Sequence, residues 1–364
     1  MTGYTAWIQA GCMTRIDGPA AERRGRSDAR PAWPSWRAPV ALGLVAAVAP
    51  MALGTWVIPL LVPVAISSVS AVGLSLLVGR AGLVSLGQGA LAGVGAFTAA
   101  SVSVRLDAPP ELALCAAVVT GGAVACALTP FLRLSGLYLS LATLVLALMF
   151  QRIAVVAEPI TGGADGIAME GNLRLGFIDV ASETAFYAVA WAAVIVAGVL
   201  VANIQRSRKG RSFEALSAGE DLARSVGVRV TTAKSTAFVI SGLCSGLSGG
   251  LYAYYNQFLT PEQFGVGQSI LLLAAVIVGG PRSPWGGVVG LMVLQLLPET
   301  VDLGSEPEAL FTPLLLLLFA GFLPQGLVAA AGTGLGRLWR IRPLTRPAQA
   351  AVTAGPSERT ADER

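Results

Sequence analysis

The sequence predicts an all-α, polytopic membrane protein with about ten helices that cross or half cross a bilayer. Hydrophobic residues make up 54% of its 364 positions and charged residues only 13%, against about 25% charged in soluble domains. The mean hydropathy is +0.68. The apolar runs are continuous and rich in Leu, Ala, Val and Gly. Membrane β-strands would instead alternate polar and apolar residues over about ten positions, so these runs indicate helices.

The expected helices follow from the length of each apolar run. We place them at 38–55, 56–78, 83–104, 112–131, 136–157, 185–204, 235–256, 268–281, 285–298 and 309–331. A full crossing needs about 20 apolar residues. The segments 268–281 and 285–298 are shorter and are separated by a Gly-Pro-Arg-Ser-Pro stretch. These two are therefore half-helices or one broken element.

Charge in the connecting segments predicts the orientation, because Lys and Arg accumulate in cytoplasmic loops. The stretch 205–234 holds seven Lys or Arg and three acids. In contrast, 158–184 holds five acids and one Arg, and 299–308 holds four acids and no base. The expected inside segments are 1–37, the turns at Arg80, Arg133 and Arg282, the stretch 205–234, and the tail after 332. Both termini are thus expected in the cytoplasm.

The same pattern divides the chain into three parts. Residues 1–37 carry six Arg and three acids among Pro, Gly and Ser, which is typical of a disordered cytoplasmic tail. No uninterrupted apolar stretch precedes the first span, so we expect no cleaved signal peptide. Residues 38–331 form the transmembrane domain, and residues 332–364 form a second disordered cytoplasmic tail.

The residue inventory argues against several classes of chemistry. The chain has no histidine, and its four cysteines show no C-x-x-C spacing, so no metal site or catalytic constellation is expected. The only lysines are Lys209 and Lys234, and Ala233 stands where a P-loop requires glycine. Transport driven by ATP would therefore need a separate ATPase subunit. An ion-coupled transporter is disfavoured because the predicted spans contain no Asp or Glu.

The charged stretch 205–234 has the pattern of two short amphipathic helices. Ser212 is a candidate cap for the first helix, in which Phe213 and Leu216 share a face. Gly219 then interrupts the pattern.

The second helix would begin with Glu220 and Asp221, because acidic residues favour a helix amino terminus. Leu222 and Val226 are four residues apart and face one way, and Gly227 is suited to a left-handed stop. The stretch is either a solvated loop kept inside by its charge or a docking element for a soluble partner.

Other polar or small residues have two interpretations each. The segment 79–100, which includes Gln88, has six Gly and six Ala; it either packs helices tightly or forms a Gly-broken element that lines a path. Arg152, beside Gln151, lies near the end of an apolar span. It either reaches to the membrane interface or faces a translocation path.

Four ordered stretches together resemble one known family. They are GLSLLVGRAGLVSLGQGALAGVGAFTAA at 73–100, RLSGLYLSLATLVLALMFQRIAVVAEPITGGADGI at 133–167, GRSFEALSAGEDLARSVGVRVTTAKSTAFVISGLCSGLSGGLYAYYNQFLTPEQF at 210–264, and AAVIVGGPRSPWGGVVGLMVLQLLPE at 274–299. The chain resembles, over residues 40–330, the permease subunits of branched-chain amino acid ABC importers of the LivM type.

This resemblance implies a type II importer fold, like that of ribose-type permeases, in a bacterial inner membrane. The permease would not be an enzyme and would hold no cofactor. It would pair with a second homologous permease or itself, receive solute from an extracytoplasmic binding protein, and use ATP bound by cytoplasmic ABC ATPases; no nucleic acid partner is implied. The ATPase-coupling loop would contain Glu214, Ala215, Gly219, Glu220, Asp221 and Gly227.

The family's T-G-G-S-D-G motif matches Thr161, Gly162, Gly163, Ala164, Asp165 and Gly166. This loop is either a plain glycine turn or a gate or docking edge for the binding protein. The chain departs from the family at Gln88, where a histidine is usual, and at residues 217–223, which read S-A-G-E-D-L-A. Branched-chain amino acids are the expected cargo, with urea, short amides or a pentose as the alternative.

Overall fold

The computed structural model describes residues 54–300, except 135, 170, 172, 176–177 and 181, together with residue 327. The predicted tails and almost all of the predicted spans 38–55 and 309–331 lie outside the described residues, as does most of the acidic segment 299–308.

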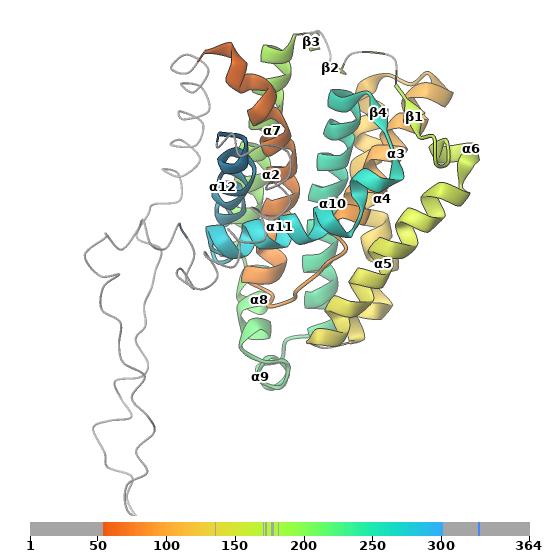
Figure 1. Ribbon diagram of the computed structural model, residues 1–364. Helices are drawn as coiled ribbons and strands as arrows, with labels where there is room; N and C mark the ends of the chain where they lie inside the picture. Colours follow the sequence, from red (N-terminus) through yellow and green to blue (C-terminus); the bar gives the residue numbers. More distant parts are fainter. Residues whose placement is uncertain are drawn as a thin grey trace, which may run out of the picture. The chain divides into compact units, whose positions relative to one another are not determined.

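Seven described helical segments are long and apolar enough to cross a membrane, which confirms the all-α, polytopic fold class. They are α2 (Ile58–Gly79), α3 (Gln88–Leu106), α4 (Pro110–Ala127), α5 (Leu137–Val156), α7 (Glu183–Arg206), α10 (Val230–Asn256), and η3 (Pro261–Phe264) with α11 (Val266–Gly279) (Figure 1). The shorter elements are η1 (Thr55–Val57), η2 (Thr129–Arg133), α6 (Glu158–Thr161), α8 (Arg208–Ala218), α9 (Glu220–Ser225) and α12 (Gly286–Thr300).

Two of the expected spans differ from a plain crossing. The predicted break between 268–281 and 285–298 is present, because α11 ends at Gly279 and α12 begins at Gly286. The expected span 83–104 becomes helical only at Gln88. Residues 80–87 stay irregular, since Gly82 has a φ of +68° and the side chains of α5 bond the backbone of this stretch. Ala81, Leu83, Ser85 and Gly87 in this stretch are buried, whereas Gly82 and Val84 are exposed.

Among the residues that the structure describes, strands are confined to two small antiparallel pairs. In one, β1 (Ile167–Ala168) pairs with β4 (Phe258–Leu259); in the other, β2 (Leu173–Leu175) pairs with β3 (Ile178–Val180). The β1–β4 pair ties the loop after α6 to the segment that follows α10. All four strands lie at one end of the bundle, opposite α8 and α9 (Figure 1).

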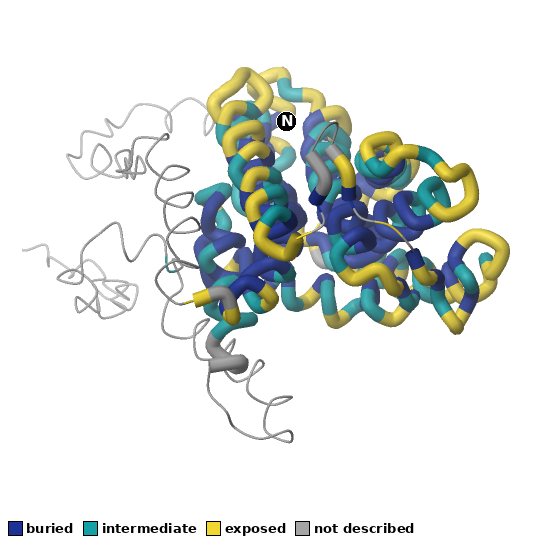
Figure 2. The backbone as a smooth tube through the Cα atoms, turned by 90° about the horizontal axis from the view of Figure 1, so that it is seen from above, coloured by how far each residue is buried: buried dark blue, intermediate teal, exposed yellow. Residues whose placement is uncertain are grey.

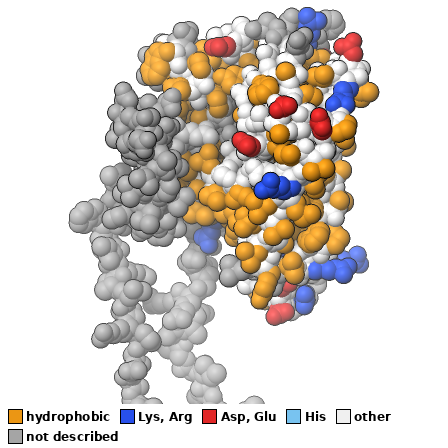
Figure 3. Space-filling model, turned by 45° about the vertical axis from the view of Figure 1, so that its right-hand side comes forward, with side chains coloured by type: hydrophobic (Ala, Val, Ile, Leu, Met, Phe, Trp, Pro, Cys, Tyr) orange, Lys and Arg blue, Asp and Glu red, His pale blue; other side chains and the backbone are white. Residues whose placement is uncertain are grey.

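Burial differs strongly among the helices. Helix α2 lies inside the bundle, where 89% of its apolar window is buried, whereas only 22% is buried in α5. Figure 2 shows this contrast as a dark blue interior bordered by yellow, exposed turns. The exposed side chains of α5 are largely Leu, Val, Ile and Met, which suits a surface in contact with lipid tails. The face drawn in Figure 3 is accordingly mainly hydrophobic, with most of its acidic side chains toward the upper end.

Glycine and alanine allow α10 to approach α3 and α4 closely. A Cβ atom on Gly249 would lie 1.8 Å from the carbonyl oxygen of Ala92 in α3. A Cβ atom on Gly246 would lie 2.4 Å from the carbonyl oxygen of Ala117 in α4. Such contacts leave no room for a side chain, and close backbone approach favours helix association in lipid.

We expect Gly246→Ala to destabilise the bundle, because the new methyl group meets the Ala117 backbone, which cannot rotate away. Overpacking of this kind costs about 1–3 kcal/mol or more. Gly267→Ala in α11 is the matched control, since nothing lies within 4 Å of a Cβ atom there. The temperature at which detergent-purified protein loses its monodisperse chromatographic peak measures the effect. Equal melting of both variants would contradict the packing described here.

Candidate functional site

The charged segment 205–234 folds into the two predicted short helices, α8 and α9, at one end of the bundle (Figure 1). The expectation that Ser212 caps the first helix is wrong. Helix α8 begins at Arg208, and the Oγ of Ser207 accepts a hydrogen bond of 3.2 Å from the backbone N–H of Lys209. Ser212 lies inside α8. The helix starts earlier because Ser207, in an extended conformation directly after α7, already provides the capping oxygen.

Glycines end both helices, as predicted. Gly219 separates α8 from α9 with a φ of +147°, and no atom lies within 4 Å of a Cβ position there. Gly227 has a φ of +80°, and the backbone N–H of Val228 donates to the carbonyl of Ala223 at 2.9 Å. This is the left-handed helix stop for which glycine is suited. The two helices therefore meet at a glycine with a left-handed φ and open space at its Cβ position.

An ion pair attaches α8 to the bundle. The carboxylate of Glu214 pairs with the guanidinium of Arg80, the residue that follows α2. Phe213 and Leu216 are buried on the same helix, and Ala215 is half-buried. Helix α8 is thus held to the bundle by apolar packing and by this ion pair.

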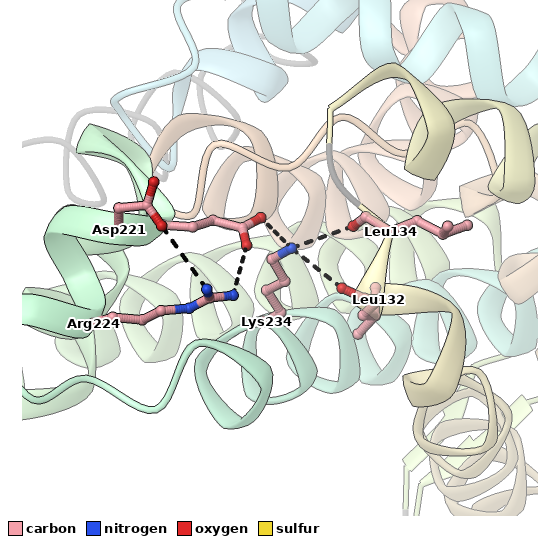
Figure 4. Close-up of polar contacts among 6 residues, drawn as sticks. Leu132, Leu134, Asp221, Arg224 and Lys234 are labelled. Carbon is pink, nitrogen blue, oxygen red and sulfur yellow. Dashed lines mark hydrogen bonds and ion pairs between the residues drawn. The ribbon is translucent and has the colours of Figure 1, made fainter.

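A second ion pair attaches α9, and it involves a buried lysine (Figure 4). The Nζ of Lys234, in the first turns of α10, lies 2.6 Å from Oε1 of Glu220. It also donates to the carbonyl oxygens of Leu132 at 3.2 Å and Leu134 at 3.3 Å. The Lys234 side chain is only 2% exposed, and that of Glu220 is 31% exposed. One nitrogen therefore joins α9, α10 and the turn that follows α4.

The neighbouring acid points the other way. The Asp221 side chain is fully exposed, at 101% of its reference area, and its nearest cation is Arg224 at 3.9 Å. Beside it, Leu222 and Val226 are 53% and 63% exposed. The acidic pair that sequence reasoning treated as one unit therefore divides into an inward Glu220 and an outward Asp221.

Gln88 lies in a buried polar cluster at the start of α3. Its side chain is fully buried, and its Oε1 accepts a hydrogen bond of 2.5 Å from Oγ of Ser245 in α10. Ser245 lies 2.7 Å from Oγ of Ser70 in α2, and the N–H of Gly89 donates to Oγ of Ser269 in α11 at 2.9 Å. Four helices meet through these contacts.

The irregular residues before α3 are held by α5. The N–H of Leu86 donates to Oγ1 of Thr143 at 2.9 Å, and Oγ of Ser140 donates to the carbonyl of Val84 at 3.0 Å. These side chains replace the helical hydrogen bonds that residues 80–87 lack. The loop thus delivers Gln88 into the bundle interior.

The two predicted site residues of α5, Gln151 and Arg152, lie in different environments. Gln151 is half-buried, and its Nε2 would lie 2.4 Å from a Cβ atom on Gly265, the residue before α11. Gly89 also approaches Gly265, since a Cβ on Gly89 would lie 2.8 Å from its carbonyl oxygen. The structure therefore places Gln151 close to the start of α3, whereas Arg152 is exposed.

The loop 161–166 is a compact glycine turn at the opposite end from α9. The buried Oγ1 of Thr161 donates to the Ala157 carbonyl at 2.9 Å and accepts from the N–H of Gly163 at 3.2 Å. Gly162, Gly163 and Gly166 have φ values of +75°, +68° and +80°. A Cβ on Gly166 would lie 2.3 Å from the Leu259 carbonyl oxygen. The glycines thus serve the turn and its packing, and only Asp165 and its neighbour Ala164 present exposed side chains.

Sequence reasoning missed the roles of Lys234 and Arg80. A signal existed for Lys234, because it is a single charge at the start of an otherwise apolar span. Arg80 entered only the loop charge count. The contacts of Ser245 with Gln88 had no signal, since the two residues are 157 positions apart.

A helical bundle with broken helices, an irregular stretch that enters it and a charged two-helix segment at one end is typical of membrane transport proteins. The sequence model of the family described as "Branched-chain amino acid transport system / permease component" matches residues 56–323. The chain therefore belongs to this family, which is one of transport permeases and not of enzymes.

Individual relatives agree with this placement. The high-affinity branched-chain amino acid transport system permease protein LivM of Salmonella typhimurium is 29% identical over 280 residues, which cover 70% of this chain and 66% of the relative. The L-arabinose transport system permease protein AraH of Escherichia coli K12 is 27% identical over 179 residues (47% of this chain, 52% of the relative). The autoinducer 2 import system permease protein LsrC of Escherichia coli O9:H4 is 30% identical over 93 residues (26% and 27%). No solved structure shows a significant match.

We expect Glu220→Gln to destabilise the protein more than Asp221→Asn, although both changes remove one carboxylate. Loss of Glu220 leaves the buried Lys234 charge without its counter-ion, and removing one partner of a buried pair costs about 3–5 kcal/mol. Because the Glu220 side chain is 31% exposed, we expect the Glu220→Gln variant to lose about 3 kcal/mol of stability or less. Asp221 is fully exposed, and solvent screens its ion pair with Arg224 at 3.9 Å, so its loss should change the stability little. Thermal unfolding in detergent compares the two, and an equal loss of stability would refute the assignment.

Proposed function

We propose that this chain is the membrane-spanning permease subunit of an ATP-binding-cassette importer for branched-chain or related hydrophobic amino acids. The observation that carries the proposal is the position of the α8–α9 segment. It lies at one end of the family's membrane domain and presents an exposed acid and apolar edge there. The energy would come from ATP hydrolysed by separate ATPase subunits.

The outward edge of α9 is the proposed ATPase-docking surface. It consists of Asp221, Leu222 and Val226, with Arg224 at its rim. Exposed apolar side chains beside both signs of charge suit a specific contact between proteins. Glu214, Ala215 and Glu220 instead hold the segment to the bundle, and Gly219 and Gly227 set where α9 begins and ends.

Within the bundle, the polar cluster around Gln88 is the proposed gate on the translocation path, with Gln151 beside it. It lies where irregular backbone enters the bundle, and such breaks mark substrate paths in transporters. Arg152 is proposed to reach toward the membrane interface, since it is an exposed residue near the end of α5. At the opposite end, Asp165 in the turn 161–166 is the proposed edge for an extracytoplasmic binding protein.

A second candidate cargo is a pentose. The arabinose permease AraH shares 27% identity over 179 residues, whereas LivM covers more of this chain, 70% against 47%. Amino acid transport is therefore favoured. Urea and short amides are proposed alternatives without a matching relative among those described above.

The proposed topology follows the charge. The end with α8 and α9 faces the cytoplasm of a bacterial inner membrane, and both tails lie on that side. Residues 38–331 form the permease domain with its coupling loop at 205–234, and the permease pairs with a second homologous subunit or with itself.

Reconstitution with the cognate ATPases, partner permease and binding protein tests the proposed function. We expect ATP-dependent uptake of radiolabelled leucine into proteoliposomes, without uptake of arabinose or urea. Arabinose or urea uptake in place of leucine would move the assignment to the alternative cargo. Leucine uptake that persists without ATPase subunits would overturn the importer assignment itself.

Cysteine labelling tests the topology. In a variant whose four native cysteines are replaced by serine, Asp221→Cys and Asp165→Cys each introduce one exposed thiol. In spheroplasts, a membrane-impermeant maleimide should label position 165 and should reach position 221 only after the membrane is opened. The opposite pattern would invert the proposed orientation.

A further inference from the structure

The Nζ atom of Lys234 connects α9, α10 and the turn after α4. This arrangement indicates a role for Lys234 in addition to the attachment of α9 to the bundle. We propose that Lys234 is a positioning residue that transmits movement of α9 into the membrane domain. It would do so by holding Glu220 of α9 and the carbonyls of Leu132 and Leu134 at the same time. This inference rests on the proposed function and assigns a role within it.

The burial of Lys234 makes this connection stiff. An ammonium group has three donors, and three acceptors lie within 3.3 Å of Nζ. The side chain is 2% exposed, so solvent has little access to Nζ and does not replace an acceptor that moves away. A buried charge that loses its counter-ion is strongly unfavourable. When a partner displaces α9, Glu220 and Lys234 therefore move together.

The carbonyl oxygens of Leu132 and Leu134 determine which other elements move with Lys234. Leu132 belongs to η2 and Leu134 follows it, and η2 leads from α4 into the turn before α5 (Figure 4). Helices α4 and α10 are packed backbone to backbone, since a Cβ on Gly121 would lie 2.6 Å from the Gly242 carbonyl oxygen. Such a pair moves as one body, because close-packed interiors transmit displacement.

Helix α10 also reaches the proposed gate. Ser245, which bonds Gln88, lies eleven residues after Lys234 on the same helix, a distance of about 16 Å at 1.5 Å per residue. Because α10 is packed against α3 as closely as against α4, a shift of α10 carries Ser245 and Gln88 together and acts on the contacts of this cluster with Ser70 of α2 and Ser269 of α11.

The two ion pairs of the segment are attached to different parts of the bundle. Glu214 of α8 holds Arg80 at the end of α2, whereas Glu220 of α9 holds Lys234 of α10. Between them, Gly219 has a φ of +147° and no packed neighbours at its Cβ position. A rotation of α9 about Gly219 thus displaces Lys234 relative to Arg80. The Lys234 contact transmits this rotation to α10, whereas the Arg80 contact does not.

The deciding experiment uses the double variant Lys234→Met with Glu220→Gln in the full reconstituted transporter. Replacing a buried pair with neutral residues of similar volume is often tolerated in stability, so the protein should insert and bind the ATPases as the wild type does. We expect the leucine imported per ATP hydrolysed to fall by roughly tenfold, within the usual range of coupling between sites. An import ratio equal to that of the wild type would overturn the proposal.

The matched control is Lys209→Met, which removes the other lysine of the sequence, an exposed one in α8. It should leave the import ratio unchanged. A fall in its ratio as large as that of the double variant would show that any loss of charge in the α8–α9 segment uncouples transport, and would also overturn the role of Lys234.

Two further outcomes also decide whether the proposal holds. If the double variant does not assemble, Lys234→Met alone removes the donor that joins α9 to the two carbonyls and leaves Glu220, which is 31% exposed, in contact with water; a wild-type import ratio in that variant overturns the proposal. If wild-type protein shows no ATP-dependent uptake, the proposed function fails. If it does and the variants match it, only the role of Lys234 fails.

Discussion

The close backbone approach of α10 to α3 and α4 is the constraint on which the rest of this structure depends. Hydrophobic burial does not by itself drive helices together in lipid, so small residues and backbone contacts must do so. Gly246 and Gly249 provide this contact in α10. Because the helix is fixed on two sides, it can hold a charge at one end, a polar contact in its middle and strand β4 beyond its other end.

Several polar groups in this apolar chain are held by defined partners. Lys234 is surrounded by three acceptors, and the irregular residues before α3 are bonded by Thr143 and Ser140. In contrast, Asp221 and the apolar residues beside it face outward. The inward contacts attach α9 to the bundle, and the outward edge is the proposed docking surface.

The sequence predicted much of the fold because continuous apolar runs have few solutions in lipid. It predicted the break before α12 and the glycine limits of α9, since glycine has specific backbone properties at such points. It did not predict the start of α3 at Gln88 or the cap at Ser207, because both depend on local competition between neighbouring residues. The different roles of Glu220 and Asp221 depend on Lys234, whose position relative to α9 only the fold determines.

Photo-crosslinking tests the docking surface most directly. A benzophenone amino acid at position 222, on the outward edge of α9, should crosslink to the ATPase subunit in the assembled transporter. The same probe at position 148, on the exposed face of α5, should not. An ATPase crosslink from position 148 with none from position 222 would contradict the assignment of α9 as the place where the ATPase binds.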